Sequence, residues 1–234
     1  AMTVVLCLLR ATGAIFPIYV GYLTKLGSSL FSYHPFFMTV AFTGLMTEAV
    51  FMFSEASLAA GRRHSTKITA HWFVLLLVAV AHSLGFASIY FNKELNNKPH
   101  FTSWHGSVGL VTSVLLWAQL SVGVFAKYPR ILSRVMQART VKANHGLFGM
   151  VVFSAGMITI ALGLWSTWFQ NNVIPPNSLH NLEISTSTIH FYCQLVWVFS
   201  FLVLYTRLMR MSVSTKTVLL NCVLFLCVGW CHLV

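Results

Sequence analysis

Four histidines give this sequence its clearest chemical signal, because each lies in or beside a strongly apolar stretch. They are His34 in Ser-Tyr-His-Pro, His71 in Ala-His-Trp, His105 in Trp-His-Gly and His145 in Asn-His-Gly. Burying an ionisable side chain among apolar residues is costly, so such histidines are candidates for function. A neutral imidazole is an axial ligand of haem iron and also binds zinc or copper.

Haem is the metal group that this set of residues favours. Zinc and copper sites would need more carboxylate or thiolate ligands beside the histidines. No Cys-x-x-Cys-His motif occurs, so a bound haem would be of the b type and not attached through thioethers. The five cysteines all lie within apolar segments, and we interpret them as packing residues: Cys7, Cys193, Cys222, Cys227 and Cys231.

The elements that position these histidines follow from composition. Of the 234 residues, 57% are hydrophobic and only 8% are charged, a balance that suits lipid as the solvent. The formal charge of +11 does not indicate nucleic-acid binding, because the basic residues sit between apolar runs next to lipid headgroups. The sequence predicts an integral, multi-pass membrane protein with no nucleic-acid partner.

Continuous apolar runs predict an all-α fold with six transmembrane helices, since a bilayer core of ~30 Å needs about 20 helical residues. The central four-helix bundle, from the second span to the fifth, would carry the histidines. We expect one domain over residues 1–210, followed by an apolar tail at 211–234 that we leave unassigned. The predicted spans are roughly 2–24, 34–54, 69–91, 104–126, 144–168 and 189–209.

Basic residues predict the orientation of the spans. Eleven follow the second, fourth and sixth spans, whereas the connectors on the other side hold three, Lys25, Lys93 and Lys98. The positive-inside rule therefore places both termini in the cytoplasm. Arg10 lies inside the first apolar run, where an unpaired charge is costly, so the start of that span is uncertain.

Topology then pairs the histidines, each of which is expected near the start of its helix. Successive spans run in opposite directions, so His34 and His105 should face each other on the non-cytoplasmic side. His71 and His145 should face each other on the cytoplasmic side. Two pairs of axial ligands predict two haems per chain. Gly106, Gly109, Gly146 and Gly149 follow two of the ligands and would admit either a flat macrocycle or a closely packed helix.

At these positions the chain resembles the cytochrome b561 family, in particular its small branch built from the six-helix core alone. The resemblance covers most of the chain. It departs at the fourth span, where this chain reads Thr102-Ser103-Trp104-His105-Gly106 in place of a Ser-Leu-His-Ser-Trp stretch, and at the first span and the tail. The matching stretches are Gly27–Pro35, Met46–Ala49, His71–Trp72, His105–Gly106 and Leu162–Gly163 through Trp168–Phe169.

The resemblance implies an ascorbate-dependent transmembrane ferric or monodehydroascorbate reductase. Such a protein takes an electron from cytoplasmic ascorbate and delivers it to monodehydroascorbate or ferric chelates on the far side. It also implies that His34, His71, His105 and His145 are the haem ligands. The family favours endomembranes, either the endoplasmic reticulum or cytoplasmic vesicles, over the plasma membrane.

Basic residues near the histidines are candidates for substrate binding. Ascorbate is an anion at neutral pH, so a cytoplasmic docking site needs positive charge. Lys67 and Lys142 precede their histidines by about one helical turn, and Arg139 lies nearby. On the other face, Lys98 and His100 could bind the acceptor. Topology and headgroup binding, or a solvated loop on the second face, are the alternatives.

Two further ionisable residues lie within spans. His82 follows His71 by eleven residues and is a rival ligand, although we favour a hydrogen-bonded core histidine. Glu48 must be paired or protonated there, and proton coupling is one hypothesis for it. The remaining histidines are expected at surfaces or interfaces: His64, His180, His190 and His232.

Two other functions stay open at this stage. A haem-carrying subunit could pass electrons to a protein partner, and a transporter could use the histidines to bind a divalent cation. Spans broken by glycine or proline are typical of transporters, so the absence of broken spans would argue against that function. Self-association as a homodimer is a further option that the sequence leaves open.

Overall fold

The computed structural model describes residues 2–54, 57–132 and 137–173. All regular structure in these residues is helical, which confirms the predicted all-α class. The predicted sixth span at 189–209 and the tail at 211–234 lie outside the described residues. So do His180, His190, His232 and four of the cysteines.

Three helices are long and apolar enough to cross a membrane: α4 (His64–Leu95), α5 (Trp104–Lys127) and α6 (Ala138–Leu164). Helix α1 (Met2–Leu23) contains a shorter apolar stretch, Cys7–Leu23. A continuous rod consists of α2 (Leu30–Thr39), the π-helix η1 (Val40–Met46) and α3 (Thr47–Phe51). The 3₁₀ turn η2 (Pro129–Leu132) and the short helix α7 (Thr167–Val173) complete the described elements.

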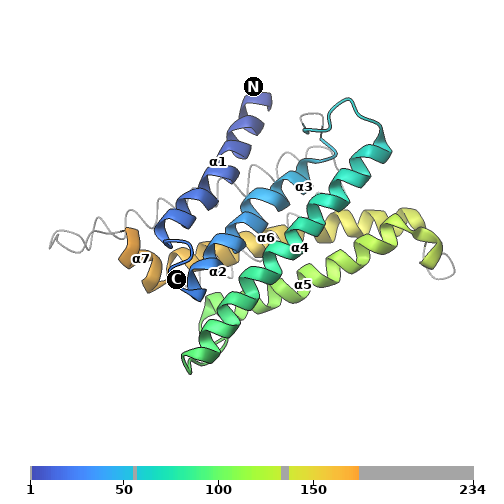
Figure 1. The fold of residues 1–234 in the computed structure, drawn as a ribbon. Coiled ribbons are helices and arrows are strands. Elements are labelled where there is room, and N and C mark those ends of the chain that lie inside the picture. The colour runs from blue at the N-terminus through green and yellow to red at the C-terminus, as the bar shows by residue number, and fades with distance from the viewer. Residues whose placement is uncertain (1, 55–56, 133–136, 174–234) are drawn as a thin grey trace.

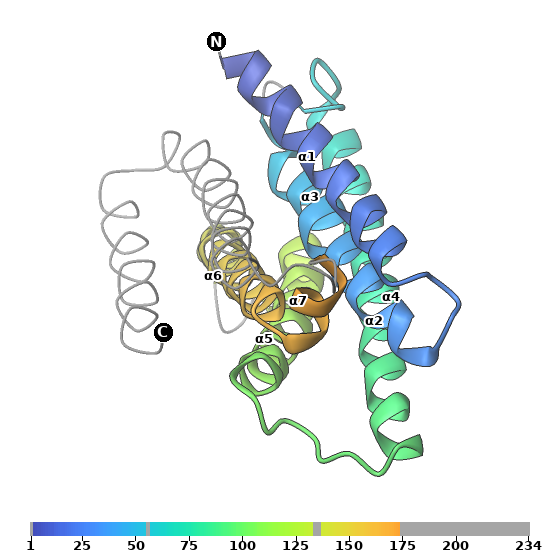
Figure 2. The ribbon, with the colours of Figure 1, turned by 90° about the vertical axis from the view of Figure 1, so that its left-hand side faces the viewer.

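The helices form two antiparallel pairs, one made of the α2–η1–α3 rod and α4, the other of α5 and α6 (Figure 1). Helix α1 packs on α2 and η1, apart from α5 and α6 (Figure 2). The two pairs meet at mid-depth, where Phe42 of η1 packs into a space on α6 left by Gly156. A Cβ atom at Gly156 would overlap the Phe42 ring, so the close approach requires glycine.

Large apolar side chains cover the outer surface of the bundle, as expected for a protein whose solvent is lipid. Examples are Ile18 of α1, Phe73 of α4 and Val114 of α5, which are 69%, 57% and 62% exposed. The interior is also apolar, with Val78, Val152 and others fully buried. The fold is thus an integral membrane fold whose helices are apolar on the outside and largely apolar inside.

Arg10 lies inside α1, and its charge is matched by an acid from the next rod. Its Nε donates a hydrogen bond to Oε1 of Glu48 at 2.6 Å, and its guanidinium lies 5.9 Å from the centre of the Phe51 ring. This ion pair explains how α1 carries an arginine within an apolar run, and it shows that Glu48 is paired.

The helices differ from the predicted bounds in one way that affects the site. Helix α4 begins five residues before the predicted residue 69, and α6 begins six residues before residue 144. The polar residues there continue the helix beyond the apolar run, because none of them is glycine or proline. The expectation that His71 and His145 open their helices was therefore wrong, and both lie two turns inside.

Candidate functional site

The first histidine pair joins α2 to α5 across the seam between the two helix pairs. The ring centres of His34 and His105 are 6.0 Å apart, with their planes at 82°. Nδ1 of His34 lies 3.0 Å from the carbonyl oxygen of Gly85, and Nδ1 of His105 lies 2.9 Å from that of Thr159. Each ring is thus held from behind while its other edge faces the partner ring.

The second pair joins α4 to α6 at the opposite end of the same seam. The ring centres of His71 and His145 are 6.2 Å apart, with their planes at 90°. Nδ1 of His71 lies 3.0 Å from the carbonyl oxygen of Ala49. Nδ1 of His145 contacts a side chain instead, the amide nitrogen of Gln119 at 2.9 Å.

The contacts to main-chain oxygens decide which ring nitrogen is available for a metal. A carbonyl oxygen only accepts hydrogen bonds, so Nδ1 of His34, His71 and His105 carries the proton. In that tautomer Nε2 carries a lone pair and no proton, which is how proteins prepare a neutral imidazole ligand.

The spacing of the rings also fits a metal held between them. A metal–nitrogen bond of about 2 Å and a ring radius of about 1 Å put two opposed imidazole ligands with their centres about 6 Å apart. Among the described residues, no cluster of three or more His, Cys, Asp or Glu side chains could hold a metal ion. Two opposed imidazoles without further protein ligands suit a metal whose other positions are filled by a macrocycle such as haem.

A repeated spacing generates both pairs. Gly85 and Thr159 each follow a histidine of their own helix, His71 and His145, by fourteen residues. Fourteen residues are about four helical turns, so each helix presents a histidine of one pair at one end and a contact for a histidine of the other pair at the other end. Gln119 likewise follows His105 of its own helix by fourteen residues and contacts His145.

Glycines on the facing helices make room for the rings. A Cβ atom at Gly163 would lie 3.2 Å from Cε1 of His105, and one at Gly123 would lie 3.1 Å from Cε1 of His145. Gly163 follows His145 by eighteen residues, as Gly123 follows His105. The same space beside a histidine ring, which a side chain would fill, is therefore found at both ends of the α5–α6 pair.

The glycines singled out from the sequence have other partners. A Cβ atom at Gly109 would lie 3.3 Å from Cγ2 of Thr159, and one at Gly149 would lie 2.9 Å from Nε2 of Gln119. These two glycines therefore admit the residues behind the histidines. A Cβ atom at Gly146 would meet nothing within 4 Å, and one at Gly106 would meet the preceding segment of its own chain.

A cavity of about 310 Å³ contains the first histidine pair. Its walls are mostly aromatic and aliphatic, with few polar groups, as in cofactor sites generally. His82, Phe42 and Ser113 line its inner part. His82 is 2% exposed, and its Nε2 lies 2.9 Å from Oγ of Ser113. The prediction of a hydrogen-bonded core histidine is thus confirmed for His82.

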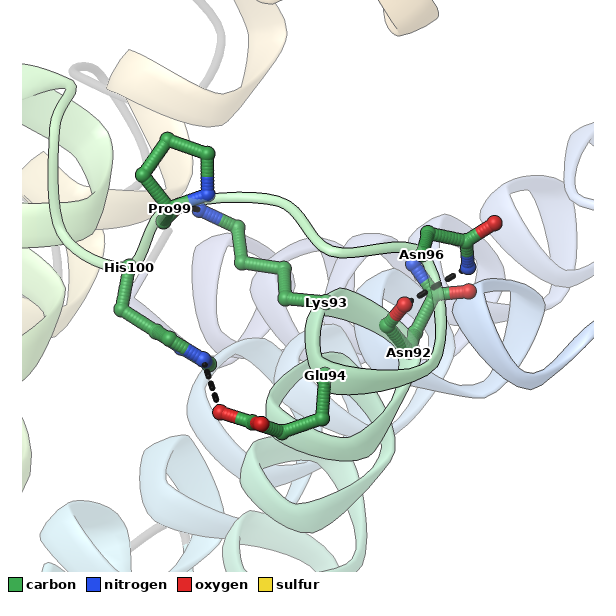
Figure 3. Close-up of polar contacts among 6 residues, drawn as sticks. All are labelled: Asn92, Lys93, Glu94, Asn96, Pro99 and His100. Atoms are coloured by element: carbon green, nitrogen blue, oxygen red, sulfur yellow. Dashed lines mark hydrogen bonds and ion pairs between the residues drawn. The ribbon is translucent and has the colours of Figure 1, made fainter.

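The mouth of this cavity carries polar residues from the last turn of α4 and from the α4–α5 connector. Lys93 and His100 both line it. Nε2 of His100 lies 2.8 Å from Oε1 of Glu94, and Nζ of Lys93 donates a hydrogen bond to the carbonyl oxygen of Pro99 at 2.7 Å (Figure 3). Lys98, which the sequence suggested as a residue that binds the acceptor, is exposed and is not among the lining residues.

Lys93 was missed as a site residue because it was read only as a marker of orientation. Its signal in the sequence is its position in the last turn before the connector, on the helix that supplies Gly85 to His34. Gln119 was also missed, and its signal is the fourteen-residue spacing from His105.

The cytoplasmic candidates lie at the end of the bundle that holds the second pair. Lys67 of α4 is half-buried, whereas Arg139 and Lys142 of α6 are exposed. A further cation lies close by, since Nζ of Lys127 is 4.3 Å from the centre of the Trp72 ring, next to His71. Several positive groups therefore surround this end.

Comparisons with known proteins identify the family of this chain. The profile of the eukaryotic cytochrome b561 family matches residues 33–170. The transmembrane reductase CYB561D2 of Bos taurus is 39% identical over 161 residues, covering 68% of this chain and 71% of the relative. The probable transmembrane reductase CYB561D1 of Homo sapiens is 35% identical over 159 residues, covering 68% and 69%. No solved structure matches the chain significantly.

Proposed function

This chain belongs to the eukaryotic cytochrome b561 family, and on that basis we propose that it is a transmembrane reductase with two b-type haems. Members of the family bind haem b. The observation that supports the proposal best is the presence of two facing histidine pairs at opposite ends of one helical bundle. Two redox centres in series would provide an electron route across the bilayer.

His34 and His105 would hold one haem, and His71 and His145 the other. Bound haem supplies one-electron chemistry, because its iron alternates between the ferric and ferrous states. The main-chain carbonyls behind three of the rings hold those imidazoles in the tautomer with the proton on Nδ1 and fix their orientation. The apolar lining of the cavity keeps water away from the ligands.

We propose cytoplasmic ascorbate as the electron donor. The distribution of basic connectors predicts that the His71–His145 end faces the cytoplasm. Lys67, Arg139 and Lys142 lie at that end and would attract the ascorbate anion.

Monodehydroascorbate or a ferric chelate is the proposed acceptor on the other face. Lys93 and His100 line the mouth of the cavity that contains His34 and His105, so they are the first candidates to contact it. Lys98 lies in the same connector and would add positive charge at longer range.

Haem quantitation on the purified protein tests the cofactor. The wild type should carry two b haems per chain by pyridine haemochrome, and ascorbate should reduce them. His71→Ala and His105→Ala should each lose one haem. No haem, or a haem content that neither change affects, would overturn the proposal.

Reconstituted vesicles test the direction of transfer. With ascorbate trapped inside and ferric citrate outside, ferrous iron should form outside only when the protein is present. The His105→Ala variant should abolish this transfer while the remaining haem is still reduced from inside. Transfer that persists in this variant would contradict a series of two haems.

A haem-bearing subunit that serves a protein partner is the second candidate. It would show both haems and no vesicle activity with small acceptors. A divalent-cation transporter is less well supported, because each histidine pair lacks further protein ligands in the described part of the chain. An endomembrane location and a homodimer remain predictions.

A further inference from the structure

We propose that Gln119 is the positioning residue of His145, with its amide oxygen accepting the Nδ1 proton when iron is bound at Nε2. This inference rests on the proposed role of His145 as a haem ligand. It assigns to Gln119 control over the reduction potential of the haem between His71 and His145.

Contact and burial identify the residue. Gln119 is 5% exposed, and its amide nitrogen lies 2.9 Å from Nδ1 of His145 and 2.6 Å from the carbonyl oxygen of the same residue. Its Oε1 is buried without a hydrogen-bond partner among the described residues. The absence of a side chain at Gly149 leaves the space that the amide occupies.

Comparison of the four histidines shows that at His145 a side chain replaces the main-chain group found at the other three. At the other three ligands the group behind Nδ1 is a main-chain carbonyl, from Gly85, Ala49 or Thr159. Gln119 occupies the position equivalent to Thr159, but it reaches the ring with its side chain. The group that contacts Nδ1 of His145 can therefore be replaced by substitution, whereas a main-chain carbonyl group cannot be.

A carboxamide can face the ring in two ways, because its oxygen and nitrogen ends have nearly the same shape. With the nitrogen toward the ring, Nδ1 must accept and the proton sits on Nε2, where it blocks a metal. With the oxygen toward the ring, Nδ1–H donates and Nε2 is free. Only the second orientation is compatible with iron.

Turning the amide brings Oε1, which has no partner in the described part of the structure, to the Nδ1–H donor, but it replaces the bond to the His145 carbonyl oxygen with a contact between two acceptors, so the amide must also shift away from that oxygen. The two orientations therefore compete, and a metal bound at Nε2 selects the orientation in which the amide oxygen points toward the ring. The stronger the acceptor behind Nδ1, the more electron density the imidazole gives to the iron and the lower its reduction potential.

Two substitutions at Gln119 separate positioning from simple packing. Gln119→Leu keeps the bulk and removes the acceptor, so the potential of the His71–His145 haem should rise. Gln119→Glu keeps oxygen atoms and removes the donor, so the potential should fall. The expected size is a tenfold change in the ratio of reduced to oxidised haem at fixed potential, which is 59 mV for one electron. A packing defect would move both variants in the same direction.

Potentiometric titration of the full-length holoprotein makes this measurement, and the low-spin ferric signals in electron paramagnetic resonance provide a second readout. Comparison with His105→Ala assigns the two potentials. The His34–His105 haem is an internal control and should not shift. Ser154→Ala removes a buried hydroxyl group whose described hydrogen bond is to the Met150 carbonyl oxygen. This change should shift the potential of neither haem.

Gln119→Leu could lose the His71–His145 haem entirely. In that case, retention of this haem in Gln119→Glu supports the inference, and loss of this haem in both variants overturns the inference. Unchanged potentials, or shifts of the same sign, in a protein that still carries two haems also overturn the inference while leaving the proposed function intact. A wild type without a haem that depends on His145 would overturn the proposed function instead.

Discussion

The carbonyl oxygen of Ala49 lies 3.0 Å from Nδ1 of His71, although Ala49 follows His34 by fifteen residues rather than fourteen. The π-helix η1 lies between these two residues and takes up the additional one in a wider turn. The rod thus keeps both its own histidine and the contact for the histidine of the other pair in place. π-helical turns are often found at functional sites, and this one preserves a register.

This relationship predicts that η1 tolerates loss of one residue. Deleting Leu45 should convert the rod to a regular helix with Ala49 still opposite His71, so both haems should be retained. Deleting Ser154 from α6 should rotate the helix beyond it by about 100° and remove the Thr159 contact to His105. Haem quantitation on the two deletions checks this, and loss of haem from the Leu45 deletion alone would contradict it.

Double substitutions should reveal which histidines share a haem. Combining His34→Ala with His105→Ala should lose no more haem than either change alone, because both remove the same site. Combining His34→Ala with His71→Ala should lose both haems, since these residues belong to different pairs. Pyridine haemochrome assays on the four variants make the comparison. Loss of one haem by the second combination would require a different pairing.

Glycine substitutions should separate crowding of a ligand from a general effect on the helices. Gly163→Ala and Gly123→Ala place a methyl group 3.2 Å from His105 and 3.1 Å from His145. Each should lower haem occupancy at its own site and destabilise the protein by about 1–3 kcal/mol through overpacking.

Gly146→Ala is the matched control, because its methyl group would meet nothing within 4 Å. It should retain both haems and gain up to about 1 kcal/mol from the higher helix propensity of alanine. Haem spectra and thermal unfolding in detergent measure both effects. Equal haem loss in all three variants would show that the glycines do not act through the rings.

The ion pair between Arg10 and Glu48 should stabilise the attachment of α1. Glu48→Met leaves a partly buried guanidinium without its carboxylate and should destabilise the protein by about 3–5 kcal/mol. The double variant Arg10→Met with Glu48→Met should lose much less, because neither charge remains. Thermal unfolding followed by tryptophan fluorescence tests this. Additive losses in the double variant would mean that the two residues stabilise the fold independently.

Much of the class and the family could be predicted from the sequence. A chain that is 57% hydrophobic and 8% charged has few folds open to it, because the bilayer forces each apolar segment to satisfy its own backbone. The stretches around His34, His71 and His105 identified the family, which the comparisons confirm. The haem ligands and the number of haems remain predictions, although the rings meet in the expected pairs.

Other features depended on how the helices rotate against one another. Each residue turns an α-helix by about 100°, so spacing along one helix does not say which neighbour a side chain meets. The contact of Gln119 with His145, the ion pair of Arg10 with Glu48, and the place of Lys93 at the cavity mouth all arise from that packing. Composition and periodicity determined that histidines would lie inside a helical membrane bundle, whereas only the tertiary structure decided which group stands behind each imidazole.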